Sequence, residues 1–144
     1  VYKRQAVDPK KVFLANRTAA KAQALAKELG CKTATNAEVA GDCDLIFLAV
    51  KPQMMEALLQ PLKFTFDERP SRFVLCSMAA GLSIARIQEM AGEDFPVIRI
   101  MPNTPASVGE GMIQSVPAMS PLRKKKPSSR SWLLRAVWMP CRKV

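Results

Sequence analysis

The chain has 144 residues, a length that suits a single domain with a hydrophobic core. Nearly half of its residues are hydrophobic, and no apolar run approaches the roughly 20 residues that a transmembrane helix needs. The chain has no histidine and its four cysteines form no CxxC pair, so we expect no metal site. We interpret Cys31, Cys43 and Cys76 as reduced residues in or near the core of a cytoplasmic protein.

The net charge of +10 is unevenly distributed along the chain. Residues 1–121 hold 14 basic and 12 acidic residues, whereas residues 122–144 hold eight basic residues and no acidic one. A change in composition this abrupt marks a boundary. We therefore expect a folded domain over residues 6–121 and a basic tail over residues 122–144. Residues 1–5 fit no element, and we interpret them as a non-native leader.

Short apolar runs alternate with helical patterns in the first 50 residues. We predict strands at Lys11–Ala15 and Cys31–Thr35 and helices at Ala19–Leu29 and Asn36–Ala40. The run Asp44–Val50 is continuously apolar after its first residue, which is typical of a strand buried on both faces of a parallel sheet.

Residues with capping chemistry bound these two helices. Thr18 is the expected N-cap of the first helix, and Gly30 follows its last residue, where glycine commonly ends a helix. Asn36 is the expected N-cap of the second helix, and the Gly41-Asp42 pair is expected to stop it.

The same alternation continues to residue 101. We predict a helix over Gln53–Leu62 that stops at Pro61, a strand at Arg72–Cys76, a helix of about nine residues from Ser83 to near Gly92, and a strand at Pro96–Met101. Strands that alternate with helices predict an α/β fold with a mostly parallel sheet and flanking helices.

Three residues follow the first predicted strand, at the end where ligands bind in open α/β sheets. Arg17 lies between the amide of Asn16 and the hydroxyl of Thr18, and a guanidinium group matches a phosphate in geometry and charge. In a dinucleotide-binding fold this pattern favours the 2′-phosphate of NADP over the free hydroxyl of NAD. The alternative is a surface arginine beside a helix N-terminus.

Small residues follow two further strands. Ala49, Val50, Lys51 and Pro52 end one strand, and Met78, Ala79, Ala80 and Gly81 follow the next. Small side chains let the backbone approach a flat ring or a sugar, and Gly81 permits a close approach or a positive φ. The alternative is that both segments are ordinary strand ends.

The turn Pro102–Pro105 carries the amide of Asn103 and the hydroxyl of Thr104 on a stiff backbone. These groups could orient a small polar ligand, and the alternative is a rigid turn without ligand. The chain has no Ser-His-Asp set, no paired carboxylates and no Walker loop, so we assign no catalytic residue. It has the character of a binding platform, which suits reactions whose chemistry belongs to a cofactor.

Together the sequence motifs at these strand ends resemble those of the pyrroline-5-carboxylate reductase family. The resemblance covers residues 6–121, and its motifs are Asn16–Thr18, Asp44–Gln53, Ser77–Gly81 and Met101–Pro105 with the following Gly109-Glu110-Gly111. It implies a Rossmann-type domain that binds NADP, with NAD as the alternative, and a following helical domain through which the family forms homo-oligomers. The implied reaction reduces 1-pyrroline-5-carboxylate to L-proline, the last step of proline biosynthesis, with no nucleic-acid or membrane partner.

The resemblance also assigns positions in the site. Asn16, Arg17 and Asn36 would face the adenosine end of the cofactor. Ala49–Pro52 and Met78–Ala80 would line its ribose and nicotinamide, and Asn103 and Thr104 would border the substrate.

Two departures from the family pattern lead to further expectations. The family begins with a strand and a glycine-rich turn that this sequence lacks, so we expect a sheet without its first strand, an unpaired position in that sheet, and a chain inactive by itself. The family continues after Pro121 with an acidic helix, where this sequence is basic.

One codon choice for Lys124–Pro127, displaced by one base, encodes Glu-Glu-Glu-Ala, and our hypothesis is a frameshifted tail from about Arg123. The alternatives for the tail are a disordered extension and an arm that binds nucleic acid or a membrane surface. For the function of the whole chain, the alternative is another small NADP-dependent imine or keto reductase.

Overall fold

The computed structural model describes residues 7–102, 113–118 and 136–137. Within these ranges one sheet contains every strand: β1 (Phe13–Leu14), β2 (Lys32–Thr33), β3 (Leu45–Leu48), β4 (Val74–Ser77), β5 (Val97–Pro102), β6 (Ile113–Ala118) and β7 (Ala136–Val137). The strand order is β2-β1-β7-β3-β4-β5-β6. All neighbours are parallel except β5 and β6, which confirms the predicted α/β fold with a mostly parallel sheet.

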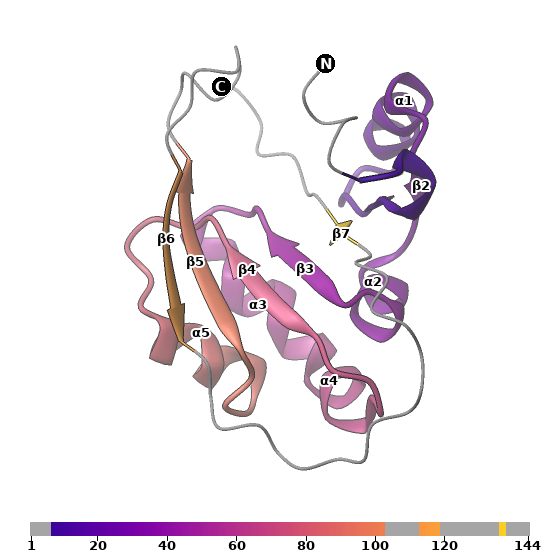
Figure 1. Ribbon diagram of the computed structural model, residues 1–144. Coiled ribbons are helices and arrows are strands. Elements are labelled where there is room, and N and C mark those ends of the chain that lie inside the picture. The colour runs from indigo at the N-terminus through magenta and orange to yellow at the C-terminus, as the bar shows by residue number, and fades with distance from the viewer. Residues whose placement is uncertain (1–6, 103–112, 119–135, 138–144) are drawn as a thin grey trace.

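Helices connect the parallel strands, as parallel pairing requires. They are α1 (Ala19–Leu29), α2 (Asn36–Asp42), α3 (Met55–Leu59), α4 (Lys63–Glu68) and α5 (Ile84–Ala91), with 3₁₀ turns at Pro9–Lys11, Pro52–Met54 and Gln60–Leu62. In Figure 1, α3, α4 and α5 lie behind β3, β4 and β5, on one face of the sheet. No helix in the described ranges has both the length and the apolar character to cross a membrane.

The core lies between the sheet and α3–α5. Alternate residues of β3, Ile46 and Leu48, are buried there, as the two-residue period of a strand requires. Three aromatic rings close one side of this core, with 5.0 Å between the centroids of Phe66 and Phe73 and 5.0 Å between those of Phe73 and Phe95. Aromatic pairs at such distances contribute about 1 kcal/mol beyond their buried area.

Arg69, which follows α4, is a buried cation that the sequence patterns do not reveal. Its Nη1 donates to the carbonyl oxygens of Ala40 and Cys43, each at 2.7 Å, and its Nη2 lies 3.5 Å from the Asp44 carboxylate. The guanidinium also lies 4.9 Å from the centroid of the Phe73 ring. Arg69 therefore binds the end of α2 and the residue before β3 to the segment that leads into β4.

Burial and charge act in opposite directions on Arg69. Burial lowers the pKa of the guanidinium, and the nearby Asp44 carboxylate raises it by a smaller amount. The pKa of Arg69 is therefore lowered overall, because the loss of hydration destabilises the cation more than the half-exposed Asp44 carboxylate stabilises it.

The ends of α1 and α2 test the predicted caps. Gly30 ends α1 with a φ of 70°, as predicted, and Thr18 occupies the N-cap of α1 without a side-chain capping bond. The prediction for Asn36 is wrong by one residue, because Thr35 is the N-cap of α2. Thr35 Oγ1 accepts from the Glu38 backbone N–H at 3.2 Å, and the Thr35 N–H donates to Glu38 at 2.7 Å. This reciprocal pair satisfies two backbone donors, and it lowers the pKa of Glu38.

Two predicted helix stops are also wrong. The Gly41-Asp42 pair lies inside α2, which is extended to Asp42 because its last carbonyl oxygens have the Arg69 donors as partners. Pro61 lies in the first turn of a 3₁₀ segment, where its missing N–H costs no hydrogen bond, and the chain continues directly into α4. The predicted cap at Ser83 is confirmed, since its hydroxyl accepts from the Arg86 N–H at 3.2 Å.

Two strands have no counterpart among the predicted elements. β6 forms six antiparallel pairs with β5 at one edge of the sheet. β7 lies between β1 and β3, at the position that we expected to be unpaired. That expectation is therefore corrected, because two residues of the basic tail pair with both neighbouring strands. The rest of the tail, and residues 1–5, lie outside the described residues.

We predict that Arg69→Met lowers the free energy of unfolding by about 3 kcal/mol, because it leaves the carbonyl oxygens of Ala40 and Cys43 without their charged donor. Urea denaturation followed by circular dichroism measures the change. The control is Arg72→Met on an exposed arginine three residues later, which is expected to change the same quantity by less than about 0.5 kcal/mol. Equal effects of the two substitutions would contradict the role of Arg69.

Candidate functional site

The carboxyl ends of the parallel strands meet at one edge of the sheet, the upper edge in Figure 1. The segments after β2, β1, β3 and β4 all begin at this edge, and they contain the residues selected from the sequence up to Gly81. Neighbouring strands are about 4.8 Å apart, so the edge from β1 to β5 spans about 19 Å. In open α/β sheets, ligands bind at this edge.

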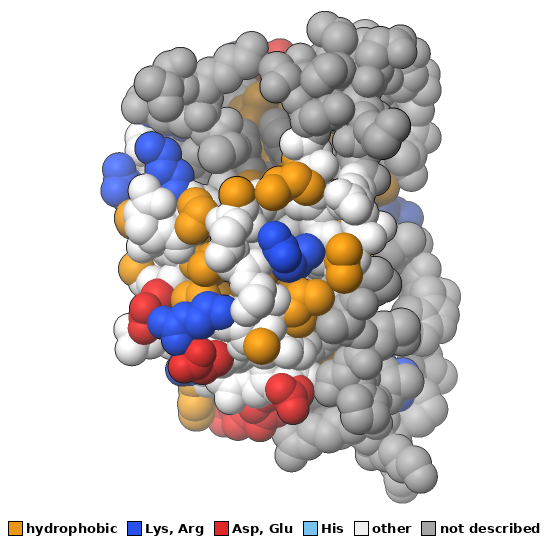
Figure 2. Space-filling view, turned by 90° about the vertical axis from the view of Figure 1, so that its left-hand side faces the viewer, with side chains coloured by type: hydrophobic (Ala, Val, Ile, Leu, Met, Phe, Trp, Pro, Cys, Tyr) orange, Lys and Arg blue, Asp and Glu red, His pale blue; other side chains and the backbone are white. Residues whose placement is uncertain are grey.

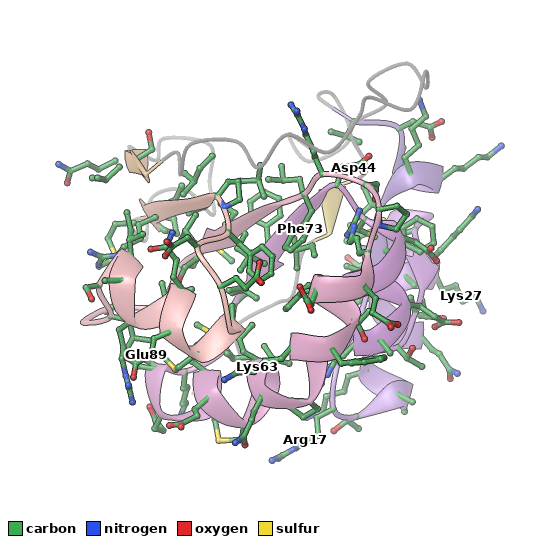
Figure 3. The ribbon with its side chains drawn as sticks, turned by 90° about the horizontal axis from the view of Figure 1, so that it is seen from below. Arg17, Lys27, Asp44, Lys63, Phe73 and Glu89 are labelled. Atoms are coloured by element: carbon green, nitrogen blue, oxygen red, sulfur yellow. The ribbon has the colours of Figure 1, made fainter. Side chains whose placement is uncertain are left out.

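The segment after β1 begins with a buried residue and ends in exposed polar ones. Ala15 is buried, and Asn16 Oδ1 accepts from the Thr18 N–H at 3.0 Å, a short turn that fixes the backbone around Arg17. The Arg17 side chain is exposed and projects outward (Figure 3). Asn36 is exposed at the start of α2, after the neighbouring strand β2. The geometry thus leaves these side chains at the surface of the edge.

The segments after β3 and β4 lie on neighbouring strands. Leu48 pairs with Ser77, and the Met78 N–H donates to the Leu48 carbonyl at 3.2 Å, which holds the two strand ends together. Ala49 and Ala79 are buried, whereas Lys51 is exposed. Pro52 opens a 3₁₀ turn that leads the chain away into α3. Two small buried residues therefore lie just beyond the ends of neighbouring strands.

Ser77 begins one of the motifs of the resemblance, but the sequence analysis assigned it no role in the site. Its side chain is buried, and its Oγ accepts from the Ala79 N–H at 3.3 Å. This bond shapes the turn after β4 from within the strand. A hydroxyl residue at the end of an otherwise apolar strand is the signal that could have identified it.

Cysteine chemistry does not fit this edge of the sheet. Burial raises the pKa of the Cys76 thiol, next to Ser77, to about 11. The thiol is therefore neutral near pH 7, and a neutral thiol is a poor nucleophile and a poor metal ligand. In the part of the chain that the structure describes, Cys31, Cys43 and Cys76 are thiols and not disulfides.

Gly81 has a φ of 75°, a conformation that side chains with a Cβ rarely adopt. Among the described residues, no heavy atom lies within 4 Å of the position that a Cβ would take there. The structure thus supports the positive-φ explanation for this glycine and leaves open space beside it.

The charges at this edge favour an anion. In the part of the chain that the structure describes, neither Arg17 nor Lys51 forms an ion pair. Acidic side chains gather instead around α5 (Figure 2), where Arg86 pairs with Glu89 at 2.7 Å. A hollow of about 230 Å³ near the C-terminal end of α5 is lined by Glu89, Glu93 and Asp94, which would repel a phosphate. It also lies toward the opposite edge of the sheet from the strand ends.

β5 ends at this edge with Pro102, which is exposed. Asn103 and Thr104, the predicted substrate-side residues, lie outside the described residues.

This architecture is that of a Rossmann-like cofactor-binding domain. A family profile described as "NADP oxidoreductase coenzyme F420-dependent" matches residues 2–81, more than half of the chain. The chain therefore belongs to this family of oxidoreductases. The match includes every candidate residue from Asn16 to Gly81 and stops before Asn103.

The similar curated proteins are pyrroline-5-carboxylate reductases. The enzyme of Corynebacterium melassecola is 38% identical over 107 residues, which are 74% of this chain and 40% of that protein. The enzyme of Escherichia coli K12 is 34% identical over 110 residues, 76% of this chain and 40% of that protein. The chain thus spans about 40% of the length of these relatives.

Solved structures of pyrroline-5-carboxylate reductases have the same fold. The Coxiella burnetii structure aligns with a TM-score of 0.72 and 25% identity over 94% of this chain and 51% of that one. The Plasmodium falciparum structure, with NADP bound, aligns with a TM-score of 0.67 and 25% identity over 87% of this chain and 44% of that one.

We predict that Gly81→Ala lowers the free energy of unfolding by about 1 kcal/mol, because a Cβ is unfavourable at a φ of 75° even with open space around it. The matched control is Gly41→Ala inside α2, where the new Cβ meets only Thr65 Cγ2 at 4.0 Å. It is expected to stabilise the protein by up to about 1 kcal/mol, since alanine favours a helix. Urea denaturation measures both, and the same sign for both would contradict the backbone argument.

Proposed function

We propose that this chain forms the cofactor-binding part of a pyrroline-5-carboxylate reductase, a cytoplasmic enzyme of proline biosynthesis. The observation that carries the proposal is the gathering of the segments after β1, β2, β3 and β4 at one sheet edge, where Arg17 forms no ion pair with any residue that the structure describes. The relatives named above and the NADP-bound structure of similar fold support it. The whole enzyme would work as a homo-oligomer on a small-molecule substrate, with no nucleic-acid or membrane partner.

The residues at the adenosine end fit NADP better than NAD. Arg17 would hold the 2′-phosphate with its guanidinium, and Asn16 and Thr18 would supply neutral polar groups beside it. Asn36, one strand further along the edge, would border the adenosine. The exposure of Arg17 and the absence of an ion pair to it in the described residues are the structural support for this assignment.

The nicotinamide end would lie over the segments after β3 and β4. Ala49 and Val50 with Lys51 and Pro52 would line the ribose, and Met78, Ala79, Ala80 and Gly81 the nicotinamide. The two buried alanines keep this surface low enough for a ring to lie against the backbone. Bound there, NADPH supplies a hydride for the carbon of the C=N bond, and Asn103 and Thr104 would orient the imine.

A second candidate function is the reduction of another small imine or a keto acid. The family profile is compatible with this second function, because it matches residues 2–81. These residues include the cofactor side of the proposed site but not Asn103 and Thr104 on the substrate side. The relatives named above favour 1-pyrroline-5-carboxylate as the substrate.

We predict that Arg17→Ala raises the Kd for NADPH by about 10- to 100-fold, the loss of a charge-assisted bond to phosphate, and changes the Kd for NADH by less than about twofold. Titration of the chain with each nucleotide, followed by calorimetry, measures both constants. Lys27→Ala is the control, because it removes a charge from the other end of α1, as Figure 3 shows. Equal losses for NADPH and NADH would contradict the phosphate assignment.

We further predict that the chain binds NADPH without turning over 1-pyrroline-5-carboxylate. Reduction of an imine requires a proton at its nitrogen, and the amide and hydroxyl of Asn103 and Thr104 are poor proton donors at neutral pH. The absorbance of reduced nicotinamide should stay constant when the imine is added to the complex. Consumption of NADPH that requires the imine would overturn this prediction.

A further inference from the structure

Ser77 is one of two polar or charged side chains that are buried among the described residues, and the other is Arg69. Arg69 has two carbonyl oxygens and a carboxylate as partners. Ser77 is 1% exposed and lies on the core face of β4, as Leu75 does two residues earlier. A hydroxyl group in an apolar core is unfavourable unless a hydrogen bond compensates it. The role of Ser77 therefore lies in the bond that it forms.

The bond of Ser77 replaces one that the sheet would supply. β4 lies between β3 and β5 (Figure 1), and the Leu75 N–H donates to the Pro96 carbonyl at 3.0 Å. Because the bonding direction alternates along a strand, the Ala79 N–H would point toward the carbonyl of Ile100 if β4 continued. The pairing of β4 with β5 ends at Ser77, and the Ala79 N–H donates to Ser77 Oγ at 3.3 Å. Ser77 thus supplies the acceptor where the chain leaves the sheet.

A bond on the other side of β4 holds the same turn against β3. Leu48 pairs with Ser77, and the Met78 N–H donates to the Leu48 carbonyl at 3.2 Å. Met78 is therefore held by β3, and Ala79 is held by the Ser77 hydroxyl. The exposed residues Ala80–Gly81 follow directly. The direction in which they leave the sheet depends on these two bonds.

We propose that Ser77 is a positioning residue for the nicotinamide half of the cofactor, an inference that rests on the function proposed above. Ser77 is buried and does not touch the cofactor, but its hydroxyl ends β4 at a defined residue and fixes the conformation of Met78–Gly81. Without the hydroxyl, the Ala79 N–H needs another acceptor, and the sheet register offers the carbonyl of Ile100. A turn that exchanges between two arrangements binds more weakly, in proportion to the fraction in the binding conformation.

The test compares two ligands on the full chain: NADPH and adenosine 2′,5′-bisphosphate, which has the phosphoadenosine end of NADP but no nicotinamide. Ser77→Ala is expected to raise the Kd for NADPH by about five- to tenfold, the contribution of one hydrogen bond, and to change the Kd for the bisphosphate by less than about twofold. The Kd for NADH should rise by the same factor as that for NADPH, in contrast to Arg17→Ala. Calorimetric titration measures all three constants.

Two further variants separate positioning from a general loss of structure. Ser77→Thr retains a hydroxyl and suits a strand, so it is expected to bind NADPH within about twofold of the unsubstituted chain. Ser71→Ala makes the same substitution at an exposed serine before β4, where the hydroxyl accepts from Arg69 Nε at 2.9 Å. It is expected to leave the binding of both ligands unchanged. Equal weakening of NADPH and bisphosphate binding by Ser77→Ala, or equally weak NADPH binding by Ser77→Thr, would overturn the proposal.

Hydrogen exchange on the unsubstituted chain gives a second readout that needs no variant to fold. The Ala79 amide should exchange slowly in the free chain, and saturating NADPH should slow exchange at Met78–Gly81 further, whereas the bisphosphate should not. Exchange there that both ligands change alike, or that neither changes, would contradict the role of Ser77.

The outcomes also separate this inference from the proposed function. If the unsubstituted chain binds neither NADPH nor the bisphosphate, the proposed function fails, and the role of Ser77 fails with it. If the unsubstituted chain binds both and Ser77→Ala binds NADPH equally tightly, the role of Ser77 alone is wrong.

Discussion

The parallel pairing of β3 with β4 is the constraint on which the rest of the structure depends. Parallel strands cannot be joined by a tight turn, so the chain must return across one face of the sheet through α3 and α4. That return creates the core, and it also brings the segments after both strands to the same edge. The segments Ala49–Pro52 and Met78–Gly81, which we assign to the nicotinamide end of the cofactor, are neighbours because of this pairing.

Arg69 lies beside the start of this pairing. Its guanidinium joins the end of α2 and the carboxylate before β3 to the segment around Phe73, which lies much further along the chain. A buried cation is expensive, and here two carbonyl oxygens, a carboxylate and an aromatic face compensate it. This polar contact lies at the opposite end of β3 and β4 from the candidate site.

The site divides into a polar half and an apolar half, and the sheet order separates them. Asn16, Arg17 and Asn36 follow the strands on one side of β7, and the small residues after β3 and β4 lie on the other. NADPH has a similar asymmetry, with a 2′-phosphate at its adenosine end and an uncharged dihydronicotinamide ring at the other. The similarity to pyrroline-5-carboxylate reductases concerns the fold and the family.

Local chemistry was enough to predict the elements whose stability is local. The helix Ala19–Leu29 and its terminator Gly30 follow from helical spacing and backbone freedom, and both are confirmed. Asn36 and Thr35 are both good N-cap residues, and only the reciprocal bond with Glu38 selected Thr35. Thus even a local prediction fails where two neighbouring residues offer the same chemistry.

The sequence by itself determined the alternation of strands and helices, the small residues at the strand ends and the α/β class, because these depend on periodicity and side-chain size. Only the tertiary structure decided that Arg69 is buried, that β6 pairs antiparallel with β5, and that Ala136–Val137 lies between β1 and β3. Each of these depends on backbone groups that need a partner at a distance in the chain. A two-residue strand such as β7 is too short to have a recognisable sequence pattern. Its position in the sheet depends on the backbone donors and acceptors of β1 and β3, which need partners.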